Sequence, residues 1–439
     1  MGARKILLLG ASGLIGRFAT DDLRGRGLDV IGIARRLSPS QKTGTFDLEM
    51  PIVAMDTAAL ARLIRDHDVD VVINCLGVLQ DGPGSGTGAV HRDFVARLLA
   101  GIRDSGRIVR FVHISIPGAA NEDRTPFSVT KREAERLIAA SGIAYAILRP
   151  GFVVAPAAYG GSALLRALAV LPLDLPAAEG ATPFQPVAIE DIVATLAWLA
   201  DRDIEHSPAN AVTWDLMQPQ SMTLGGVIDQ FRRSFGTASM PRLALPAWML
   251  DAGAELGDLV SWLGWAPPMR SNAIAELRRG VTGDPAAWIA ATGIVPKTIA
   301  QTIGQRPASI QDKWFARLFL IKALVIASLV VFWSVSGFIS LFVSYRAAGG
   351  ILGAHGFPSP LIAPVTVLTS LMDMSIGILI AFRRTCAFGL VAGIVASLGY
   401  MLGAAILTPD LRIEPLGALV KTGPAIVLMA VALTTLDNR

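Results

Sequence analysis

Short apolar runs alternate with segments of helical spacing through the first 200 residues of the chain. The runs hold few charges, which is typical of parallel strands buried on both faces. Between them we expect helices, for example over Phe127 to Ser141, where Lys131 and Glu135 share a face at i, i+4 spacing. Strands that alternate with helices predict an α/β doubly wound Rossmann domain with a parallel sheet. The expected strands are Lys5 to Leu9, Asp29 to Ile33, Thr45 to Leu48, Val71 to Cys75, Val109 to Ile114 and Ala144 to Leu148.

Four long apolar segments occupy the C-terminal part of the chain. Each holds at most one charged residue, and each is long enough to cross a hydrocarbon core of about 30 Å at about 1.5 Å per residue. The pattern predicts a C-terminal all-α four-helix transmembrane bundle. The segments are Ala323 to Tyr345, Leu361 to Phe382, Cys386 to Thr408 and Leu416 to Leu436.

Composition and charge support a soluble part joined to a membrane part. The hydrophobic content of 52% and the mean hydropathy of +0.52 exceed what a soluble α/β protein needs. The formal charge is +4, with +5 from Lys313 onward and −1 before it, which gives no electrostatic case for nucleic acid. By the positive-inside rule, Arg383 and Arg384 after the second span predict a cytoplasmic Rossmann domain with both termini on that side. We therefore expect a multi-pass protein of the cytoplasmic (inner) membrane.

Neither the cysteines nor the N-terminus suggests another class of protein. Cys75 and Cys386 have no metal-ligand spacing around them, so we expect neither a metal site nor a disulfide framework. The N-terminus begins the first expected strand directly, without the charged and apolar regions of a cleaved signal.

The stretch after the first strand has glycines at three-residue intervals and then opens into a helical segment. Such a turn directs backbone N–H groups at an anion, with the positive end of the helix dipole behind them. The spacing is G-x-x-G-x-x-G rather than the G-x-G-x-x-G of the dehydrogenase fingerprint, and alone it is a weak match. The prediction of a dinucleotide site therefore rests on the strand before the loop and the helix after it. The expected contacts in this loop are Gly10, Ser12, Gly13, Leu14, Ile15 and Gly16.

Residues at the ends of later strands complete the expected dinucleotide site. Arg35 and Arg36 follow the second strand, where an arginine would accept a 2′-phosphate, so NADP (NADPH) is preferred over NAD; the alternative is a pair of solvated loop charges. Asp47 and Leu48 are expected to border the adenine, with an ordinary turn acid as the alternative. The remaining expected contacts are Leu76 and Gly77 near the nicotinamide ribose, Lys131, and Pro150 after the last strand.

The glycine loop, Ser115, Lys131 and the segment Leu148-Arg149-Pro150-Gly151 together resemble an atypical member of the short-chain dehydrogenase/reductase superfamily. The resemblance covers about half of the chain and is closest to the branch with epimerase-like, NmrA-like and complex I accessory-subunit proteins. In catalytic members a tyrosine four residues before the lysine is the general acid/base, the lysine lowers its pKa and holds the nicotinamide ribose, and a serine orients the substrate carbonyl. The resemblance therefore implies catalytic roles for Ser115 and Lys131.

The tyrosine position of that family is Phe127, which has no proton to transfer. The nearby His113, Tyr145 and Tyr159 are expected to be core or loop residues rather than a replacement acid. Phe127 therefore leaves open whether the carbonyl chemistry of the family is lost or replaced.

The four spans, with Trp333 in the first and Asp373 in the second, resemble the DoxX-like membrane family. Asp373 is placed near mid-bilayer, where a charged group costs at least roughly 2.5 kcal/mol. It is interpreted as part of a quinone or proton site, or as an acid whose hydrogen bonds lock the bundle. A direct pair with Lys421 would require a depth offset of about 10 Å to be closed.

The pattern thus divides the chain into three parts: an NAD(P)-binding Rossmann domain with a small substrate lobe over residues 1–217, a helical connecting or interfacial region over 218–312, and a four-span DoxX-like domain over 313–439. The connecting region is rich in tryptophan, which favours the water–lipid interface. An interfacial cap is one interpretation, and a small helical substrate lobe is preferred for Thr182 to Met217. The tryptophans are Trp248, Trp262, Trp265, Trp288 and Trp314.

These observations favour a membrane-anchored, NAD(P)(H)-binding oxidoreductase-like protein that acts on a quinone or another lipophilic substrate. The alternative is a non-catalytic NADP(H)-binding sensor or assembly factor for a membrane complex, suggested by Phe127. The expected partners are a dinucleotide and the lipid bilayer.

Overall fold

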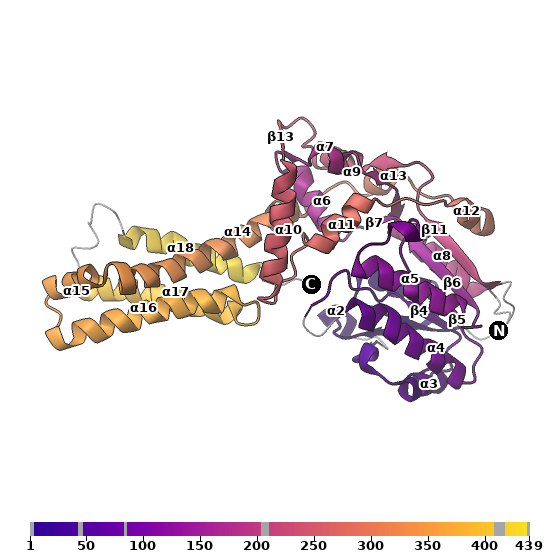
Figure 1. Ribbon diagram of the computed structural model, residues 1–439, viewed down its shortest axis with the longest axis horizontal. Helices are drawn as coiled ribbons and strands as arrows, with labels where there is room; N and C mark the ends of the chain where they lie inside the picture. The colour runs from indigo at the N-terminus through magenta and orange to yellow at the C-terminus, as the bar shows by residue number, and fades with distance from the viewer. Residues whose placement is uncertain (1–3, 43–46, 83–85, 203–209, 408–417, 437–439) are drawn as a thin grey trace. The chain divides into compact units, whose positions relative to one another are not determined.

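The computed structural model describes residues 4–42, 47–82, 86–202, 210–407 and 418–436 (Figure 1). The chain divides into two compact units. The first consists of Met1–Asp258 with Pro268–Ala316, and the second of Leu259–Pro267 with Arg317–Arg439. The chain therefore leaves the first unit for the nine residues 259–267 and returns to it before the long apolar helices begin.

A parallel sheet forms the centre of the first unit, with the strand order β11-β6-β5-β4-β1-β2-β3 among the described residues (Figure 1). The order reverses between β1 and β4, which is the switch point where doubly wound sheets bind their ligands. Every residue of β4 is buried, because helices cover both faces of the sheet. The strands are β1 (Lys5–Leu9), β2 (Asp29–Ala34), β3 (Leu48–Glu49), β4 (Val71–Asn74), β5 (Arg110–Ile114), β6 (Tyr145–Pro150) and β11 (Val212–Leu216).

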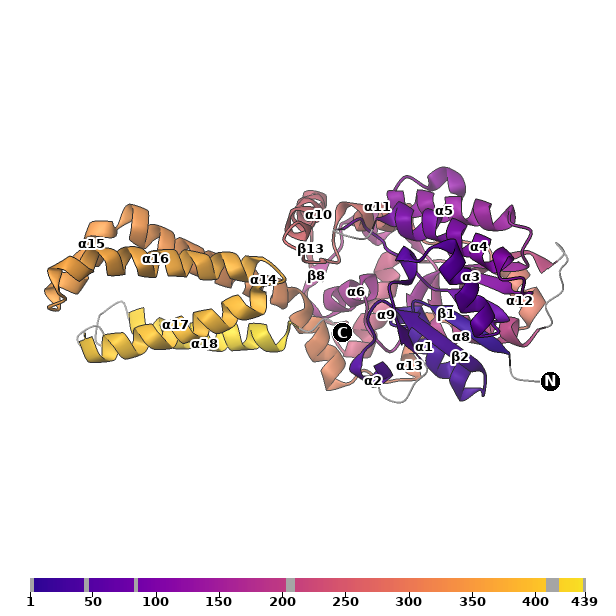
Figure 2. The same cartoon turned by 90° about the horizontal axis from the view of Figure 1, so that it is seen from below.

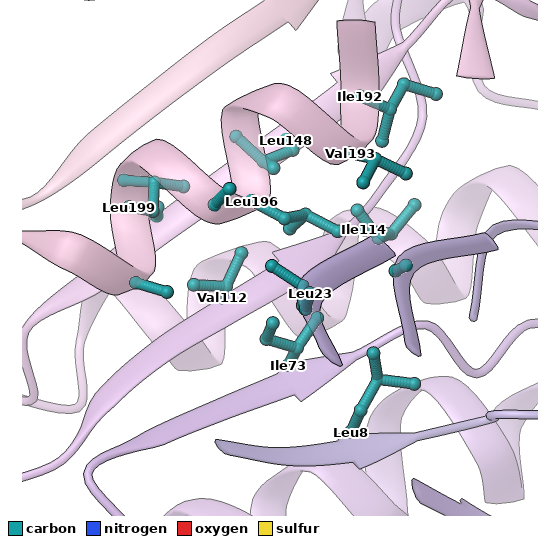
Figure 3. Close-up of a cluster of buried hydrophobic side chains, with 14 of the residues drawn as sticks. Leu8, Leu23, Ile73, Val112, Ile114, Leu148, Ile192, Val193, Leu196 and Leu199 are labelled. Atoms are coloured by element: carbon teal, nitrogen blue, oxygen red, sulfur yellow. The ribbon is translucent and has the colours of Figure 1, made fainter. Parts of the chain in front are cut away.

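Two apolar clusters hold helices on the two faces of this sheet. One face packs against α3 (Thr57–Asp66), α4 (Phe94–Asp104) and α5 (Pro126–Ala139). The other packs against α1 (Leu14–Gly25) and α8 (Ile189–Asp201). Figure 3 shows this second cluster, where Leu196 and Leu199 of α8 lie with Ile73 and Val112 of the sheet. The predicted Rossmann sheet is confirmed, although the expected third strand begins later, at Leu48, and Thr45 lies outside the described residues.

A smaller lobe of the first unit begins after β6 in the sequence and has an apolar cluster of its own. It contains the parallel pair of β7 (Phe152–Val154) and β10 (Pro186–Ala188), and β12 (Met222–Thr223) pairs with β9 (Pro183–Phe184). β8 (Leu173–Asp174) pairs with β13 (Leu243–Ala244). The other helices before the apolar region are α2 (Pro39–Lys42), α6 (Gly161–Val170), α7 (Ala177–Gly180), α9 (Leu224–Phe235), α10 (Ala247–Ser261), α11 (Ser271–Arg279), α12 (Ala286–Thr292) and α13 (Ile299–Gly304).

The tryptophans of the connecting region do not share one environment. Trp288 of α12 is fully buried in the cluster beneath α8, and its Nε1 donates to Thr195 Oγ1 at 3.0 Å. The expectation of an interfacial position is therefore wrong for Trp288, because this part of the chain folds back onto the Rossmann sheet. Trp248, Trp262 and Trp314 are exposed.

The second unit is helical (Figure 2). Within the described residues three helices are long and apolar enough to cross a membrane, and a shorter apolar helix, α18, follows them. These helices indicate a membrane protein. Gly337 and Gly377 allow α14 and α16 to approach closely, since a Cβ at Gly377 would lie 2.2 Å from Ser334 Oγ. The helices are α14 (Ile310–Phe338), which continues as a π-helical turn (Ile339–Val343), α15 (Tyr345–Ala354), α16 (Ser359–Ala381), α17 (Cys386–Leu407) and α18 (Ala418–Thr434).

The acid in the second span has a partner on the third. Tyr400 Oη of α17 donates to Asp373 Oδ1 of α16 at 2.7 Å, and Asp373 is 9% exposed. The side chain of Lys421 is exposed. Among the contacts of the described residues, the partner of this carboxyl is therefore the hydroxyl of Tyr400 and not Lys421.

Candidate functional site

The glycine loop joins β1 to α1 at the switch point of the sheet. Gly10 has a φ of +89°, and a Cβ there would lie 3.2 Å from the backbone carbon of Cys75, at the end of β4. Gly13 N donates to Gly10 O at 2.9 Å, which closes the turn. A Cβ at Gly16 would lie 2.1 Å from Gly10 O, so only glycine fits there. The loop therefore packs helix against strand as the sequence predicted.

The N-terminus of α1 is suited to an anion. Its N-cap residue, Gly13, provides no side-chain hydrogen bond to the first turn. The first N–H groups of an α-helix have no partner within the helix, and here they belong to the predicted contacts Leu14, Ile15 and Gly16. Ser12 is half-buried beside them in the same turn. This cradle fits the pyrophosphate of a dinucleotide.

The predicted adenosine contacts surround the ends of β2 and β3. Arg35 and Arg36 follow β2 and are both exposed. A hydrogen bond to β3 fixes the turn that carries them, because Leu37 N donates to Glu49 Oε2 at 3.0 Å. This hydrogen bond and one from Lys42 hold the pKa of Glu49 below its usual value. Both arginines can therefore project from a fixed turn.

Asp47 and Leu48 are held by the protein itself. Asp47 Oδ1 accepts from Gly32 N at 3.0 Å and from Arg24 Nη2 at 2.6 Å, and its side chain is 1% exposed. Leu48 pairs with Ile33 of β2. These contacts join the β2 and β3 backbones next to the glycine loop, and a role for either residue at the adenine stays a prediction.

Lys131 of α5 lies at the carboxyl ends of β4 and β5. Its Nζ donates to Ile114 O at 2.8 Å and to Leu76 O at 3.1 Å, and a Cβ at Gly77 would lie 3.9 Å from the same amine. The side chain is buried, and this burial lowers the pKa of Lys131 to about 8. The predicted residues Ser115, Leu76, Gly77 and Lys131 thus come together at one end of two neighbouring strands.

A histidine that the sequence did not single out fixes the neighbouring loop. Val78 N donates to His91 Nε2 at 3.0 Å, so the ring proton is on Nδ1 and is donated to Thr130 Oγ1 at 2.9 Å. Burial, with the charge of Lys131, lowers the pKa of His91 to about 3, so the ring stays neutral. The ring of Phe127 meets it edge-on at 5.5 Å. Phe127, at the position of the family's tyrosine, therefore packs against a histidine whose two ring nitrogens both make hydrogen bonds.

The expected core position of the other nearby histidine is confirmed. His113 is fully buried, and its Nδ1 lies 3.1 Å from Asn74 Nδ2. Because the amide of Asn74 donates, the proton of His113 is on Nε2, which has no hydrogen-bond partner among the residues that the structure describes. Burial holds the pKa of His113 well below its usual value.

A buried network of charges lies beside Ser115. Glu135 binds Arg149 through both carboxylate oxygens, at 2.9 and 2.6 Å, and Arg132 at 3.1 Å. Although burial raises it, the hydrogen bonds and charges of Arg149, Ser115 and Arg132 hold the pKa of Glu135 below its usual value. The Ser115 hydroxyl is buried and interacts with this carboxylate, and within the described part of the chain it makes no hydrogen bond of normal geometry.

Helix α11 completes this network from a distant part of the sequence. Arg279 of α11 binds Asp123 at 2.6 Å and donates to Pro117 O at 3.1 Å. Asp123 also binds Arg132 at 2.8 Å. The hydroxyl of Thr125, the N-cap of α5, donates to Glu276 of α11. The lobe therefore closes over the segment between Ser115 and α5.

Pro150 lies at the end of β6, next to this network. It is buried and pairs with Leu216 of β11. A Cβ on the following Gly151 would lie 2.1 Å from Gln185 O, so only glycine fits where β7 departs. Contact of Pro150 with a cofactor stays a prediction.

Comparisons with known proteins agree with this arrangement. Residues 6–170 match the NAD dependent epimerase/dehydratase family, and residues 330–430 match the DoxX-like family. No curated protein matches the chain.

Solved structures share the fold of the first unit. One is MoeE5 in complex with UDP-glucose and NAD, at 16% identity and a TM-score of 0.50, covering 72% of this chain and 99% of that one. Another is dTDP-glucose 4,6-dehydratase from Bacillus anthracis str. Ames in complex with NAD, at 13% identity and a TM-score of 0.52, covering 69% and 95%. At these identities the likeness concerns the fold alone. The chain therefore joins an NAD-dependent epimerase/dehydratase domain, of the extended short-chain dehydrogenase/reductase kind, to a C-terminal DoxX-like domain.

Proposed function

We propose that the chain is a membrane-anchored NAD(P)(H)-binding oxidoreductase-like protein. The position of Lys131 carries the proposal. Its ammonium has three N–H donors, of which Ile114 O and Leu76 O accept two. The third is available to a ribose hydroxyl of a dinucleotide whose pyrophosphate is held at the N-terminus of α1.

Two side chains supply the chemistry around that position. The bound dinucleotide would supply or accept a hydride. The hydroxyl of Ser115 has no hydrogen-bond partner of normal geometry among the described residues, so it can orient a substrate oxygen. With Phe127 in the tyrosine position, Lys131 is the nearby group that releases a proton close to neutral pH. We therefore assign the third N–H of Lys131 to the ribose hydroxyl, and its proton can reach the substrate oxygen through that hydroxyl.

The choice of dinucleotide rests on the turn after β2. Two structural neighbours are complexes with NAD. Arg35 and Arg36 stand at the position that meets the adenosine ribose in this fold, and a guanidinium pairs with a phosphate through two hydrogen bonds. We propose on this basis that NADP(H) is preferred.

The proposed class of substrate rests on the fact that the first unit is part of the same chain as the helical second unit. A hydride carrier on a protein with apolar spanning helices suits a quinone or another lipophilic acceptor. The arginines at 383 and 384, after α16, favour the cytoplasmic side for that end of the spans. We accordingly place the first unit in the cytoplasm, at the inner membrane.

A second candidate function is a non-catalytic NADP(H)-binding sensor or assembly factor. The contact of Phe127 with His91 favours it, because neither ring can provide the missing acid. Turnover separates the two proposals.

The experiment is a titration of the full-length protein in lipid nanodiscs with NADPH and NADH, followed by addition of quinones and carbonyl compounds in the same cuvette. Oxidation of bound NADPH supports the oxidoreductase. Tight binding without oxidation by any acceptor supports the sensor. Absence of binding to either dinucleotide contradicts both.

A further inference from the structure

A short segment between α10 and α11 belongs to the second unit although the residues on either side belong to the first. It consists of Leu259–Pro267, here named the interface segment. Helix α10 ends inside it, where Gly264 N donates to Ser261 O at 3.0 Å. Gly264 has a φ of +85°, a left-handed conformation that glycine adopts without strain. The chain therefore turns sharply at this residue.

The turn attaches the interface segment to the end of a spanning helix. Arg383 N donates to Leu263 O at 2.9 Å, and Trp265 Nε1 donates to Ala381 O at 2.7 Å. The guanidinium of Arg383 lies 5.6 Å from the centroid of the Trp265 ring, and the ring packs against the apolar cluster of the spans. These contacts fix the level of the segment along α16.

That level is the boundary of the hydrocarbon. Helix α16 runs for 23 residues from Ser359 to Ala381, about 34 Å at about 1.5 Å per residue, which matches a hydrocarbon core of about 30 Å. Two arginines, 383 and 384, follow its end directly. The turn that holds Trp265 therefore lies where lipid tails give way to headgroups.

Large apolar side chains of the interface segment are exposed at this level. Trp262 is 84% exposed and Leu259 is 65% exposed, and the neighbouring Phe382 is 45% exposed. Indole rings favour the headgroup region, where the ring is apolar and the N–H can still be hydrated. The spans of the same unit also expose large apolar side chains, such as Leu324, which is 66% exposed.

We propose that the interface segment is a membrane-surface anchor, with Trp262 and Leu259 inserted at the boundary between headgroups and acyl chains of the bilayer that the second unit spans. The occupant of this surface is lipid, because Trp265 of the segment packs in the same apolar cluster as Val325 and Ile326 of the first span. The anchor is independent of the chemistry proposed for the first unit.

The test measures the depth of these positions in the full-length protein in nanodiscs. Trp262→Cys is made in a background where Cys75 and Cys386 are replaced by alanine, and a nitroxide is attached. Collisions with oxygen, which concentrates in lipid, are compared with collisions with a water-soluble nickel chelate. The matched control is Leu243→Cys of the first unit, which is 68% exposed. Leu259→Cys serves as the second probe and replaces the first if Trp262→Cys fails to fold.

We expect labels at 262 and 259 to favour oxygen over nickel and to report a depth near the phosphates, while the label at 243 favours nickel. Trp265→Phe, which keeps the ring but loses the bond to Ala381 O, should make the label at 262 more mobile. Equal nickel exposure at 262 and 243 would overturn the proposal. Spin–spin broadening of the spectrum that grows with the protein-to-lipid ratio would also overturn the proposal. It would show that a second copy of the chain lies against this surface.

Discussion

Lys131 Nζ donates to Ile114 O at 2.8 Å, which ties the helix that carries the lysine to the carboxyl end of β5. A second donation goes to Leu76 O at the end of β4. A charged lysine retains one further N–H for a ligand, whereas a neutral lysine has two N–H donors and both are occupied here. The protonation of this one amine therefore controls whether the site offers a ribose hydroxyl a charged N–H donor or only the lone pair of a neutral amine.

The first prediction is a pH dependence of dinucleotide binding. Burial lowers the pKa of Lys131 to about 8, so the amine is charged below that pH and neutral above it. The affinity for NADPH should be constant from pH 6 to 7 and should weaken as the pH rises through about 8. Titrations of the full-length protein by fluorescence at fixed ionic strength measure it. Lys131→Met should bind more weakly and lose the step; a step that persists in this variant would show that another group is titrating.

The same lysine affects stability with a definite sign. Its pKa is about 8 in the folded protein and 10.5 in the unfolded chain, so between these values the unfolded chain binds the extra proton. The contribution of Lys131 to the free energy of unfolding should therefore rise as the pH increases from about 8 to 10.5. Comparison of unfolding midpoints of the wild type and Lys131→Met at pH 7.5 and pH 10 isolates this contribution.

A second prediction concerns the missing hydroxyl. Phe127 and Lys131 are four residues apart on α5, so the two side chains share a face of the helix. Phe127→Tyr should introduce a general acid and raise NADPH-dependent carbonyl reduction by about 10²-fold or more. Phe127→Leu, which changes the ring without adding a proton donor, is the matched control. Equal rates in wild type and Phe127→Tyr at saturating NADPH would mean that position 127 does not face the substrate oxygen.

The sequence predicted those parts of the site that depend on local pattern. The glycine loop and Lys131 lie on or beside elements whose hydrophobic periodicity is clear, and the structure brings Lys131 to Ser115 because parallel strands end at one edge. The contact of Arg279 with Asp123 joins residues 156 positions apart, and nothing in the local sequence marks either as a partner. Trp288 was misplaced for a similar reason, since an indole in a proline-rich stretch suits both an interface and a core.

A third prediction tests the buried charge network. Arg132 is 5% exposed and binds Asp123, Glu135 and the carbonyl groups of Pro117 and Gly118. Arg132→Met keeps the length of the side chain but removes the buried charge that Asp123 and Glu135 share, so the free energy of unfolding should fall by about 3 to 5 kcal/mol.

The control for that variant is a surface pair of similar geometry. Arg26 binds Asp22 at 2.5 Å with side chains 51% and 42% exposed, and Arg26→Ala should cost less than about 1 kcal/mol. Both variants are measured by denaturant unfolding of the detergent-solubilised protein, followed by tryptophan fluorescence. Similar losses in the two variants would contradict a special role for the network.

A fourth prediction addresses cofactor choice. Arg36 is exposed at the turn after β2, where it can meet a 2′-phosphate. Arg36→Ala should weaken NADPH by about 10-fold or more and leave NADH nearly unchanged, because a charge-assisted hydrogen bond is worth roughly 1.5 to 3 kcal/mol. Arg92→Ala, which removes a charge from an exposed pair with Asp93, is the control. Equal weakening of both dinucleotides would remove the preference for NADP.

The fifth prediction separates structure from chemistry in the spans. Tyr400 Oη donates to Asp373 Oδ1 at 2.7 Å, which joins α17 to α16. Asp373→Asn keeps a side-chain oxygen that accepts this hydrogen bond but cannot release a proton, whereas Asp373→Leu removes the acceptor. Hydrogen bonds between membrane helices contribute about 0.6 kcal/mol on average and up to about 1.7 kcal/mol. If the bond is a structural lock, Asp373→Leu and Tyr400→Phe should lower the free energy of unfolding by similar amounts in that range, with Asp373→Asn close to wild type.

A fully stable Asp373→Asn protein that has lost quinone-dependent NADPH oxidation would instead show that the acid carries protons, because it would have kept the hydrogen bond and lost only the ionisable group.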